Sequence, residues 1–373
     1  MMAPSEPLVF VWDNFGPLHA DRCDAVASHF GPARPVHGIE LFQRSDTYAW
    51  VSETRASFTK TTLFQRRPAW FVIAWHLVRA IFATRSRHIF LCHYQEPYIF
   101  VTAMLLRLLG RRVYFMGDSK FDDEPRRLRR ERLKSLFVWP YAGALTASLR
   151  SAEYLHLLGF DRRPVELGYD TISVSRIQQL AGSPPAPGGM PHDQRHFTII
   201  ARLVPKKNIA LAIAALALLK TRGQLARKLV ICGSGPEEAD LRARGQAAGL
   251  ELWVTFSGFV QSDAVSQILA TSLCLILPST QEQFGQVVSE ALAMGVPAIV
   301  SDRCGARDEL VRSGVNGFVI EADNASGLAH FMHILDSEPE TWSAMAQATE
   351  PMRHLADVPR FAGAVAALIS ATR

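Results

Sequence analysis

Residues 278–302 decide the fold of this chain, and they read PSTQEQFGQVVSEALAMGVPAIVSD. The apolar run 273–277 precedes them and predicts a buried strand. After a loop that contains Gly285, residues 287–294 have the pattern of one amphipathic helix, which ends at a Gly-Val-Pro sequence. A second apolar run, 298–300, follows at once. The order strand, loop, helix, strand predicts an α/β protein with a parallel sheet.

Two carboxylates, Glu282 and Glu290, bracket the loop and the first turns of this helix. Open α/β sheets bind ligands at the carboxyl ends of their strands, where helix N-termini favour anions. A carboxylate works against that field, so it suits the hydroxyl groups of a ligand better than its phosphate. The pair therefore predicts a ligand that is part polyol and part phosphate. The alternative is that both are solvated charges that stabilise the start of the helix.

The block around the two glutamates extends beyond their spacing. They enclose seven residues, including Phe284-Gly285, and the chain continues with Gly-x-Pro at 295–297, Gly305 and Gly-x-Asn-Gly at 314–317. In order and context this resembles the Glu-x7-Glu signature of the retaining group-1 glycosyltransferases, the family-4 type of GT-B fold. The resemblance implies two Rossmann-like domains that face a central cleft, and transfer of a sugar from a nucleotide-diphosphate sugar.

The same resemblance implies roles for individual residues. Glu290 would hold ribose hydroxyls, and Glu282 would engage the donor sugar. Backbone N–H groups at Phe284, Gly285 and Gln286 would meet the sugar hydroxyls or the phosphate. All five are thus candidates for donor binding, and Glu282 is also a catalytic candidate.

A second cluster of candidates follows the predicted strand 197–201. Arg202 and Lys207 are five residues apart in a strand-to-helix loop, so both can converge on a diphosphate at the helix N-terminus. The stretch resembles the Gly-Arg-Leu-x-x-x-Lys-Gly motif of the same family, with Ala201 and Asn208 in place of its two glycines. We expect Arg202 and Lys207 to bind the donor and to neutralise the charge on the leaving diphosphate, with surface charge as the alternative.

Two further donor contacts are expected near the nucleoside. The strand 228–232 ends in Gly233-Ser-Gly235-Pro236, a turn that lies beside the nucleoside in the family. Val260 ends the next predicted strand, whose following loop passes the base in relatives. The turn alone would also fit a dehydrogenase, but the third glycine of a dinucleotide-binding loop is missing.

The first half of the chain repeats the order strand, loop, helix less clearly. An apolar strand at 8–12 runs into a loop with Gly16, which in the family faces the cleft and touches donor phosphate or acceptor. The strand 89–93 ends at His93, where similar transferases place a histidine that contacts the donor sugar. Gln95 stands where some relatives have a second histidine, so the choice between His93 and Gln95 stays open, as does a purely structural role for His93. The segment that follows the helix predicted from about His19, up to about residue 62, looks irregular.

The sequence predicts four parts. Residues 1–180 form an acceptor-binding Rossmann-like domain, and the Pro- and Gly-rich stretch 181–195 is the linker. Residues 196–350 form the nucleotide-sugar domain, and 351–373 form a C-terminal helix that crosses back to the first domain, as the GT-B resemblance implies.

Composition excludes several classes. No apolar run reaches the roughly 18–20 residues of a membrane span, no secretory signal is visible, and the five cysteines have neither disulfide nor zinc spacing. We therefore expect a cytoplasmic protein. Residues 1–190 carry 24 Lys and Arg against 17 Asp and Glu. An apolar helix at 68–83, which arginines flank, is most simply packed on the sheet, and a basic helix at 126–134 is most simply solvated. Peripheral contact with an anionic membrane is the alternative for both. Nucleic acid is not expected, because no recognition fold is evident.

The function inferred from the sequence is a retaining, hexosyltransferase-type transfer to a glycan, lipid-linked or small-molecule acceptor. No Asp-x-Asp motif stands out, so no metal or cofactor is expected to be required. The alternatives are a sugar-nucleotide epimerase, a pseudo-glycosyltransferase coupling enzyme, or a non-catalytic sugar-nucleotide-binding protein.

Overall fold

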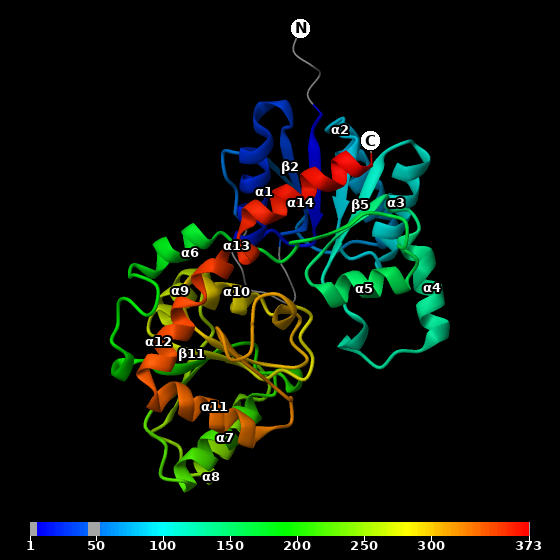
Figure 1. Ribbon diagram of the computed structural model, residues 1–373. Coiled ribbons are helices and arrows are strands. Elements are labelled where there is room, and N and C mark those ends of the chain that lie inside the picture. The colour runs from blue at the N-terminus through cyan, green and yellow to red at the C-terminus, as the bar shows by residue number, and fades with distance from the viewer. Residues whose placement is uncertain (1–5, 44–52, 373) are drawn as a thin grey trace. The chain divides into compact units, whose positions relative to one another are not determined.

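The computed structural model describes residues 6–43 and 53–372, which divide into two compact units. Unit 1 comprises residues 1–121, 125–173 and 357–373, and unit 2 comprises 122–124 and 174–356. Each unit contains one parallel sheet with helices on both faces, the Rossmann-like arrangement (Figure 1). Among the described residues, no helix has the length and apolar character needed to cross a membrane.

The described part of unit 1 holds a seven-stranded sheet in the order β3-β2-β1-β4-β5-β6-β7, with all neighbours parallel. Its strands are β1 (Leu8–Trp12), β2 (Val36–Phe42), β3 (Thr59–Phe64), β4 (His88–Leu91), β5 (Arg112–Gly117), β6 (Gly143–Thr146) and β7 (Val165–Leu167). Its helices are α1 (Pro17–Phe30), α2 (Trp70–Ala83), α3 (Pro97–Leu108), α4 (Leu128–Val138), α5 (Leu149–Leu157) and α14 (Val358–Ala371).

Two of these strands lie in the segment that the sequence indicated as irregular. β2 pairs with the whole of β1 through its residues Val36 to Glu40, and β3 forms the edge of the sheet beyond it. β3 reads TKTTLF and is largely exposed, so it lacks the apolar run by which a buried parallel strand is recognised. The expectation was wrong because edge strands do not need to be apolar on both faces.

α1 and α14 lie side by side in Figure 1 and cover one face of the unit 1 sheet. Phe361 of α14 packs against Phe10 of β1, with ring centroids 5.7 Å apart. The opposite face is covered by α2, α3, α4 and α5, whose buried side chains form a second apolar layer. The last helix of the chain is therefore part of the core of the first unit.

The described part of unit 2 holds a six-stranded parallel sheet in the order β10-β9-β8-β11-β12-β13. Its strands are β8 (His196–Ile200), β9 (Leu229–Cys232), β10 (Val254–Gly258), β11 (Ser272–Leu277), β12 (Ala298–Ser301) and β13 (Gly317–Ile320). Its helices are α6 (Val174–Ala181), α7 (Ile209–Thr221), α8 (Glu238–Ala247), α9 (Ser262–Ala270), α10 (Gln286–Ala293), α11 (Ala325–Ser337), α12 (Pro339–Gln347) and α13 (Arg353–Ala356).

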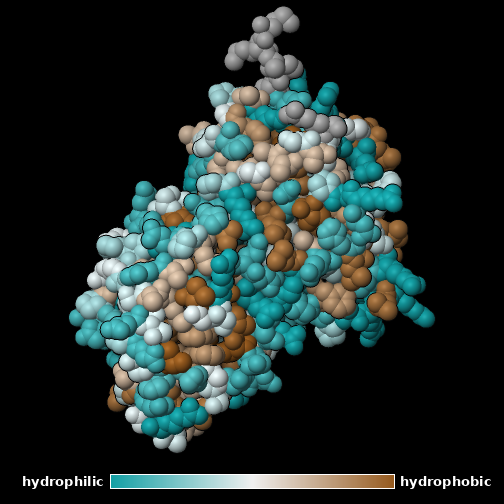
Figure 2. Space-filling model, in the orientation of Figure 1, coloured by the Kyte–Doolittle hydropathy of each residue, from teal (hydrophilic) through white to brown (hydrophobic). Residues whose placement is uncertain are grey.

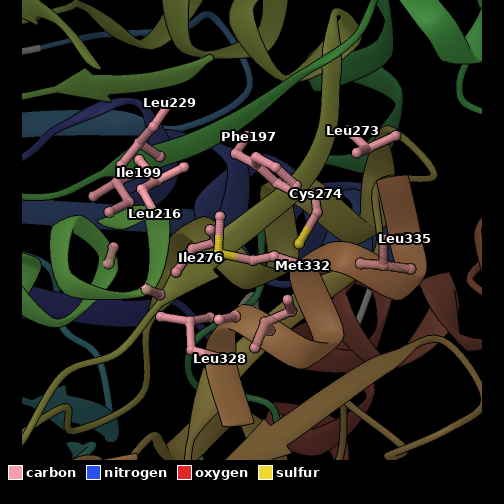
Figure 3. Packing of buried hydrophobic residues seen from close by; sticks show 14 of the residues in the cluster. Phe197, Ile199, Leu216, Leu229, Leu273, Cys274, Ile276, Leu328, Met332 and Leu335 are labelled. Carbon is pink, nitrogen blue, oxygen red and sulfur yellow. The ribbon is translucent and has the colours of Figure 1, made fainter. Parts of the chain in front are cut away.

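The core of unit 2 forms where α7 and α11 pack on the sheet. Figure 3 shows side chains of α7 and α11, such as Leu216 and Met332, around Phe197 of β8 and Ile276 of β11. β11 is buried along its whole length, as expected for a central strand of a parallel sheet.

The Pro- and Gly-rich stretch predicted as the linker, 181–195, lies within unit 2 in the structure. The Ala186 N–H donates to the Met294 carbonyl (2.8 Å), and Arg195 donates to the Met190 and Gly188 carbonyls (2.9 and 2.8 Å). Apart from the short segment 122–124, the boundaries between the units fall at 173/174 and 356/357. Proline and glycine rule out a helix here, but they do not prevent the segment from packing on the domain that follows.

Candidate functional site

The topological switch point of the unit 2 sheet lies between β8 and β11. From β8 the chain proceeds through β9 to β10, and from β11 it proceeds in the other direction through β12 to β13. The loops after β8 and β11 therefore diverge at the carboxyl edge of the sheet. Open α/β sheets bind their ligands at this position.

The loop after β8 carries Arg202 and Lys207. Arg202 is half-buried one residue beyond Ala201, and Lys207 ends a short 3-10 turn, Pro205–Lys207, directly before α7. Asn208 then caps α7 with φ 54°, a left-handed conformation that asparagine tolerates better than most residues. Its side-chain amide donates to the Pro278 carbonyl (3.0 Å) and the Ala322 carbonyl (2.7 Å). Asn208 thus fixes the loop after β8 against the loop after β11.

An ion pair spans the switch point. Lys207 Nζ donates to Glu282 Oε2, and both side chains are largely buried, with 14% and 12% of their surface exposed. The Ser279 hydroxyl also donates to Glu282 Oε2 (3.1 Å). Ser279 is fixed in turn, because the Ser301 hydroxyl donates to its carbonyl oxygen (2.6 Å). The structure thus brings together Lys207 and Glu282, two residues that the sequence indicated separately.

The β11–α10 loop lies against the segment that follows β12. The Ala306 N–H and the Cys304 thiol both donate to the Phe284 carbonyl (2.8 and 3.0 Å), and the Gly305 N–H donates to the Glu282 carbonyl (3.2 Å). A Cβ on Gly305 would lie 1.9 Å from the Gln283 carbonyl oxygen, so only glycine allows this approach. The backbone that carries Glu282 is thereby held in place from both sides.

α10 begins directly after this loop. Gly285 is its N-cap with φ 99°, and Gln286 is its first residue. Phe284 and Gly285 are buried, whereas Gln286 and Glu290 are half-buried on the helix. The predicted donor contacts Glu282, Phe284, Gly285, Gln286 and Glu290 therefore occupy one loop and the start of one helix.

The glycines of the Gly233-Ser-Gly235 turn have a packing role. A Cβ on Gly233 would lie 1.8 Å from the Ala201 carbonyl oxygen, and one on Gly235 would lie 2.3 Å from that of Leu203. The Leu203 N–H donates to the Ser234 carbonyl (2.9 Å). The turn therefore lies directly on the β8–α7 loop, and this contact accounts for both glycines without a dinucleotide.

Val260 lies two residues beyond β10 and is half-buried. β10 is the edge strand of the sheet, next to β9, so the Val260 loop lies at the same carboxyl edge as the Gly233 turn. Its predicted contact with the base remains a prediction.

The unit 1 candidates also lie at a switch point, between β1 and β4. Gly16 is the N-cap of α1 with φ −82°, a conformation open to any residue, so its backbone does not require glycine. His93 follows β4 with φ 56°, and its Nε2 lies 4.0 Å from Asp13 Oδ2 of the loop after β1. The neighbouring Gln95 is exposed and donates to the Tyr94 hydroxyl (3.1 Å). The structure describes these residues in a different unit from Glu282 and Lys207.

Burial changes the titration of two groups near the candidates. His19 packs on the rings of Trp12 and Phe15, and this burial, reinforced by the positive charge of Arg22, lowers the pKa of His19 well below its usual range. His19 therefore stays neutral, and its Nδ1 accepts a hydrogen bond from the Gly16 N–H (3.1 Å). In unit 2, burial and the nearby Glu282 carboxylate raise the pKa of the Cys304 thiol to about 12. Cys304 is thus a neutral hydrogen-bond donor.

Sequence reasoning did not identify the residues that hold the site together. Ser279, Cys304 and Gly305 orient Glu282 and its loop, yet none was named as a site residue. Their signal was present, because Ser279 and Gly305 lie within or close to the motif block. Asn208 was noted only as a replacement for glycine, and its two side-chain hydrogen bonds depend on carbonyls that are distant in sequence.

Comparison with known proteins agrees with this architecture. Residues 185–350 match the family described as "Glycosyl transferases group 1". Alpha-D-kanosaminyltransferase of Streptomyces kanamyceticus is 29% identical over 153 residues, covering 41% of this chain and 39% of that protein. The GDP-mannose-dependent alpha-(1-6)-phosphatidylinositol dimannoside mannosyltransferase of Mycobacterium tuberculosis is 37% identical over 141 residues, covering 37% and 35%. The matched segment therefore spans well under half the length of these relatives.

Two solved structures resemble the entire chain. Sucrose-phosphate synthase from Thermosynechococcus elongatus superposes with a TM-score of 0.73 and 17% identity, covering 98% of both chains. HepE of Anabaena, solved in complex with UDP, superposes with a TM-score of 0.72 and 18% identity, covering 98% of this chain and 99% of that one. The chain has the GT-B fold of two Rossmann-like domains, and its segment 185–350 is similar to the group-1 glycosyl transferases.

Proposed function

We propose that the protein is a glycosyltransferase that moves a sugar, with retention of anomeric configuration, from a nucleotide-diphosphate sugar to an acceptor hydroxyl. The observation that carries the proposal is the Lys207–Glu282 ion pair across the β8/β11 switch point, within the segment that matches the group-1 family. A cation and a carboxylate at this edge supply the two kinds of contact that a sugar diphosphate needs.

The cations serve the leaving group. As the bond to the anomeric carbon breaks, negative charge grows on the diphosphate. Lys207 and Arg202, both in the loop after β8, would stabilise that charge together with the N-terminus of α7. Lys207 is already oriented by Glu282 before any donor binds, so little reorganisation is needed during the reaction.

The carboxylates serve the sugar and the ribose. Glu282 can accept hydrogen bonds from sugar hydroxyls while it keeps its contacts with Lys207 and Ser279, since each carboxylate oxygen has two lone pairs. Glu290 lies in α10, four residues after its first residue Gln286, and would accept from ribose hydroxyls. Arg202 and Lys207 supply positive charge at the diphosphate, so we propose that the reaction requires no metal ion. Retained turnover in the presence of EDTA tests this.

Two readings compete with transfer. A sugar-nucleotide epimerase or coupling enzyme on this fold would bind the same donor, and a non-catalytic protein would bind it without turnover. The kanosaminyltransferase and mannosyltransferase relatives favour transfer, although they match only this segment. Only the mannosyltransferase is named for an acceptor, a phosphatidylinositol dimannoside, so the acceptor of this chain is left as a glycan, a lipid-linked sugar or a small molecule.

The test has two stages. Thermal unfolding with UDP, GDP, ADP and NAD is measured first, on the wild type and on Glu290→Ala. A ligand at 100 times its Kd stabilises by about 2.7 kcal/mol, and we expect this from one nucleoside diphosphate on the wild type alone. Sugar donors of that nucleotide are then tested for release of the diphosphate and for the anomeric configuration of the product. Stabilisation by NAD alone, or epimerised donor without transfer, would reject the proposal.

A further inference from the structure

Helix α4 has its polar residues inside and its leucines outside. Glu131 and Lys134 face the interior of unit 1 and are 5% and 8% exposed. Leu133 and Leu136 face outward and are 56% and 59% exposed. A surface helix ordinarily buries its apolar stripe and solvates the opposite face. The reversed arrangement in α4 leaves apolar area in water, which costs free energy unless another surface covers it.

A hydrogen-bonded network keeps α4 in this orientation. The Tyr154 hydroxyl of α5 donates to Glu131 Oε2 (2.5 Å) and accepts from Lys134 Nζ (3.0 Å) and Arg126 Nη1 (3.2 Å). Burial disfavours the ionised form of Glu131, but its contacts with Tyr154 and Lys134 outweigh that effect and lower the pKa of this carboxyl. Because the inward face is satisfied by this network, the outward leucines are a fixed feature of the fold.

Exposed aromatic residues extend the apolar surface onto α2. Phe71 and Trp75 lie one turn apart on the same stripe of the helix and are 60% and 67% exposed. α3 lies between α2 and α4. Its Arg107 stacks on Trp139 at the end of α4, with 4.7 Å to the ring centroid, and its Phe100 packs on Phe137 (4.6 Å between centroids). α2, α3 and α4 therefore form one continuous layer on the same face of the unit 1 sheet.

The same layer is strongly basic. Residues 66–140 contain fifteen Lys and Arg against six Asp and Glu. Four exposed arginines, Arg127, Arg129, Arg130 and Arg132, surround the outward leucines of α4. In Figure 2, apolar and polar side chains alternate along the margin where α3 and α4 lie in Figure 1. Two copies of this face would repel each other, so its charge favours an anionic partner over a second copy of the chain.

We propose that the outer surface of α2, α3 and α4 docks on an anionic lipid bilayer. Leu128, Leu133, Leu136 and Trp139 on α4, with Phe71 and Trp75 on α2, enter the boundary between headgroups and acyl chains. The arginine stems lie along that apolar surface while their guanidinium groups reach lipid phosphates. The surface is separate from Lys207 and Glu282, so the inference does not depend on the transfer reaction.

The test measures binding of the full chain to vesicles by co-sedimentation. Vesicles of phosphatidylcholine alone are compared with vesicles of phosphatidylcholine and phosphatidylglycerol, at low and high salt. We expect binding to the anionic vesicles, weakened by salt because surface charges are screened. Binding that is absent, or equal on neutral vesicles, would overturn the proposal, and neither result would affect the donor-site assignment.

Two double variants locate the surface. Arg129→Gln/Arg132→Gln removes two charges, and at about 1 kcal/mol for each arginine near an anionic surface the affinity should fall roughly 30-fold. Leu133→Ser/Leu136→Ser should lower it at least about tenfold, because two leucines can no longer enter the bilayer. All four side chains are exposed, so both variants should unfold at the wild-type temperature.

The matched controls lie in unit 2. Leu252→Ser alters a leucine that is 83% exposed, and Arg242→Gln/Arg244→Gln removes two exposed arginines of α8. These should bind vesicles within about twofold of the wild type, since their positions lie outside the proposed surface. An equal loss in controls and test variants would show general electrostatic adsorption and reject the surface. A dimer in solution that Leu133→Ser/Leu136→Ser dissociates would assign the surface to a second copy instead.

Discussion

Both units have their candidate residues at the topological switch point of the sheet, but the residues found there differ. In unit 2 the switch point between β8 and β11 carries Arg202, Lys207 and Glu282, with a cation paired to a carboxylate across the sheet edge. In unit 1 the switch point between β1 and β4 carries Asp13 and His93, whose side chains come only within 4.0 Å. The parallel sheet decides where a site forms, and the loop residues decide which ligand chemistry it serves.

The two points also differ in how firmly their residues are held. Glu282 accepts from Lys207 and Ser279, and its loop is hydrogen-bonded to residues 304–306. His93 instead has a left-handed backbone conformation, and its side chain is exposed between the buried Cys92 and Tyr94. The Glu282 side chain is therefore held by more side-chain contacts than the His93 side chain.

The largest expected effect is loss of turnover in Lys207→Ala. Removing one group that stabilises the charge of a transition state lowers kcat about 10²–10³-fold, and the variant also leaves Glu282 without its cation. Lys206→Ala is the matched control, because Lys206 belongs to the same turn and contributes its backbone carbonyl to Thr280. Steady-state kinetics should separate the two, and equal losses would remove the assignment of the diphosphate to unit 2.

The next effect concerns how strongly the segment after β12 holds the loop that carries Glu282. Gly305→Ala would place a Cβ 1.9 Å from the Gln283 carbonyl oxygen, so the loop that carries Glu282 must shift. We expect a loss of about 3 kcal/mol in the free energy of unfolding. Gly245→Ala in α8 has open space at its Cβ and should gain about 1 kcal/mol. Urea unfolding of both variants gives the comparison, and a tolerated Gly305→Ala would mean that this loop is not fixed by the segment after β12.

A third pair compares the two non-glycine residues with positive φ at the switch points. Asn208 (φ 54°) makes two side-chain hydrogen bonds, so Asn208→Gly should lower the free energy of unfolding by about 1–2 kcal/mol. His93 (φ 56°) has no comparable anchor, so His93→Gly should relieve backbone strain and raise stability by up to about 1 kcal/mol. If His93 acts on the ligand, His93→Gly also lowers turnover while Gln95→Ala does not. The reverse result would assign the role to Gln95.

The smallest effect is the pH dependence of unit 1. The folded-state pKa of His19 is lowered, so below its ordinary range of about 6.5 the unfolded chain binds a proton that the folded protein does not. Stability is therefore full above that range and falls as the pH falls, by at most about 1.4 kcal/mol per pH unit for this group. His19→Gln should flatten that part of the profile. Thermal melts between pH 7.5 and pH 5, at intervals of about half a unit, measure it, and an unchanged slope would exclude His19 as a source.

Sequence alone predicted where the unit 2 candidates lie in the fold, because these residues belong to short motifs tied to strand ends. A parallel strand fixes the direction of the loop that follows it, so Arg202, Lys207 and Glu282 could be placed at one edge without coordinates. The motif spacing could not reveal that Lys207 and Glu282 are ion-paired, since 75 residues separate them. The roles of the predicted donor contacts remain predictions.

The sequence was least informative for elements whose buried face differs from the face that their hydrophobic pattern indicates. β3 is a polar edge strand, and α4 buries Glu131 while it exposes Leu133. Both depend on tertiary partners, namely β2 and the Tyr154 hydroxyl, that lie outside the local window. Periodicity reports which face of an element is apolar, but not which face the rest of the fold covers.

The placement of α14 has a consequence for biosynthesis. The chain leaves unit 1 at residue 173 and re-enters it at 357, so everything between is complete before the last helix emerges from the ribosome. Unit 2 can therefore fold without α14, whereas the unit 1 core must wait for Phe361 to reach Phe10. The half of the protein that is synthesised first is then the last to be finished, and a chain shortened to end before 357 would keep residues 174–356 of unit 2 but lack the helix that packs on Phe10.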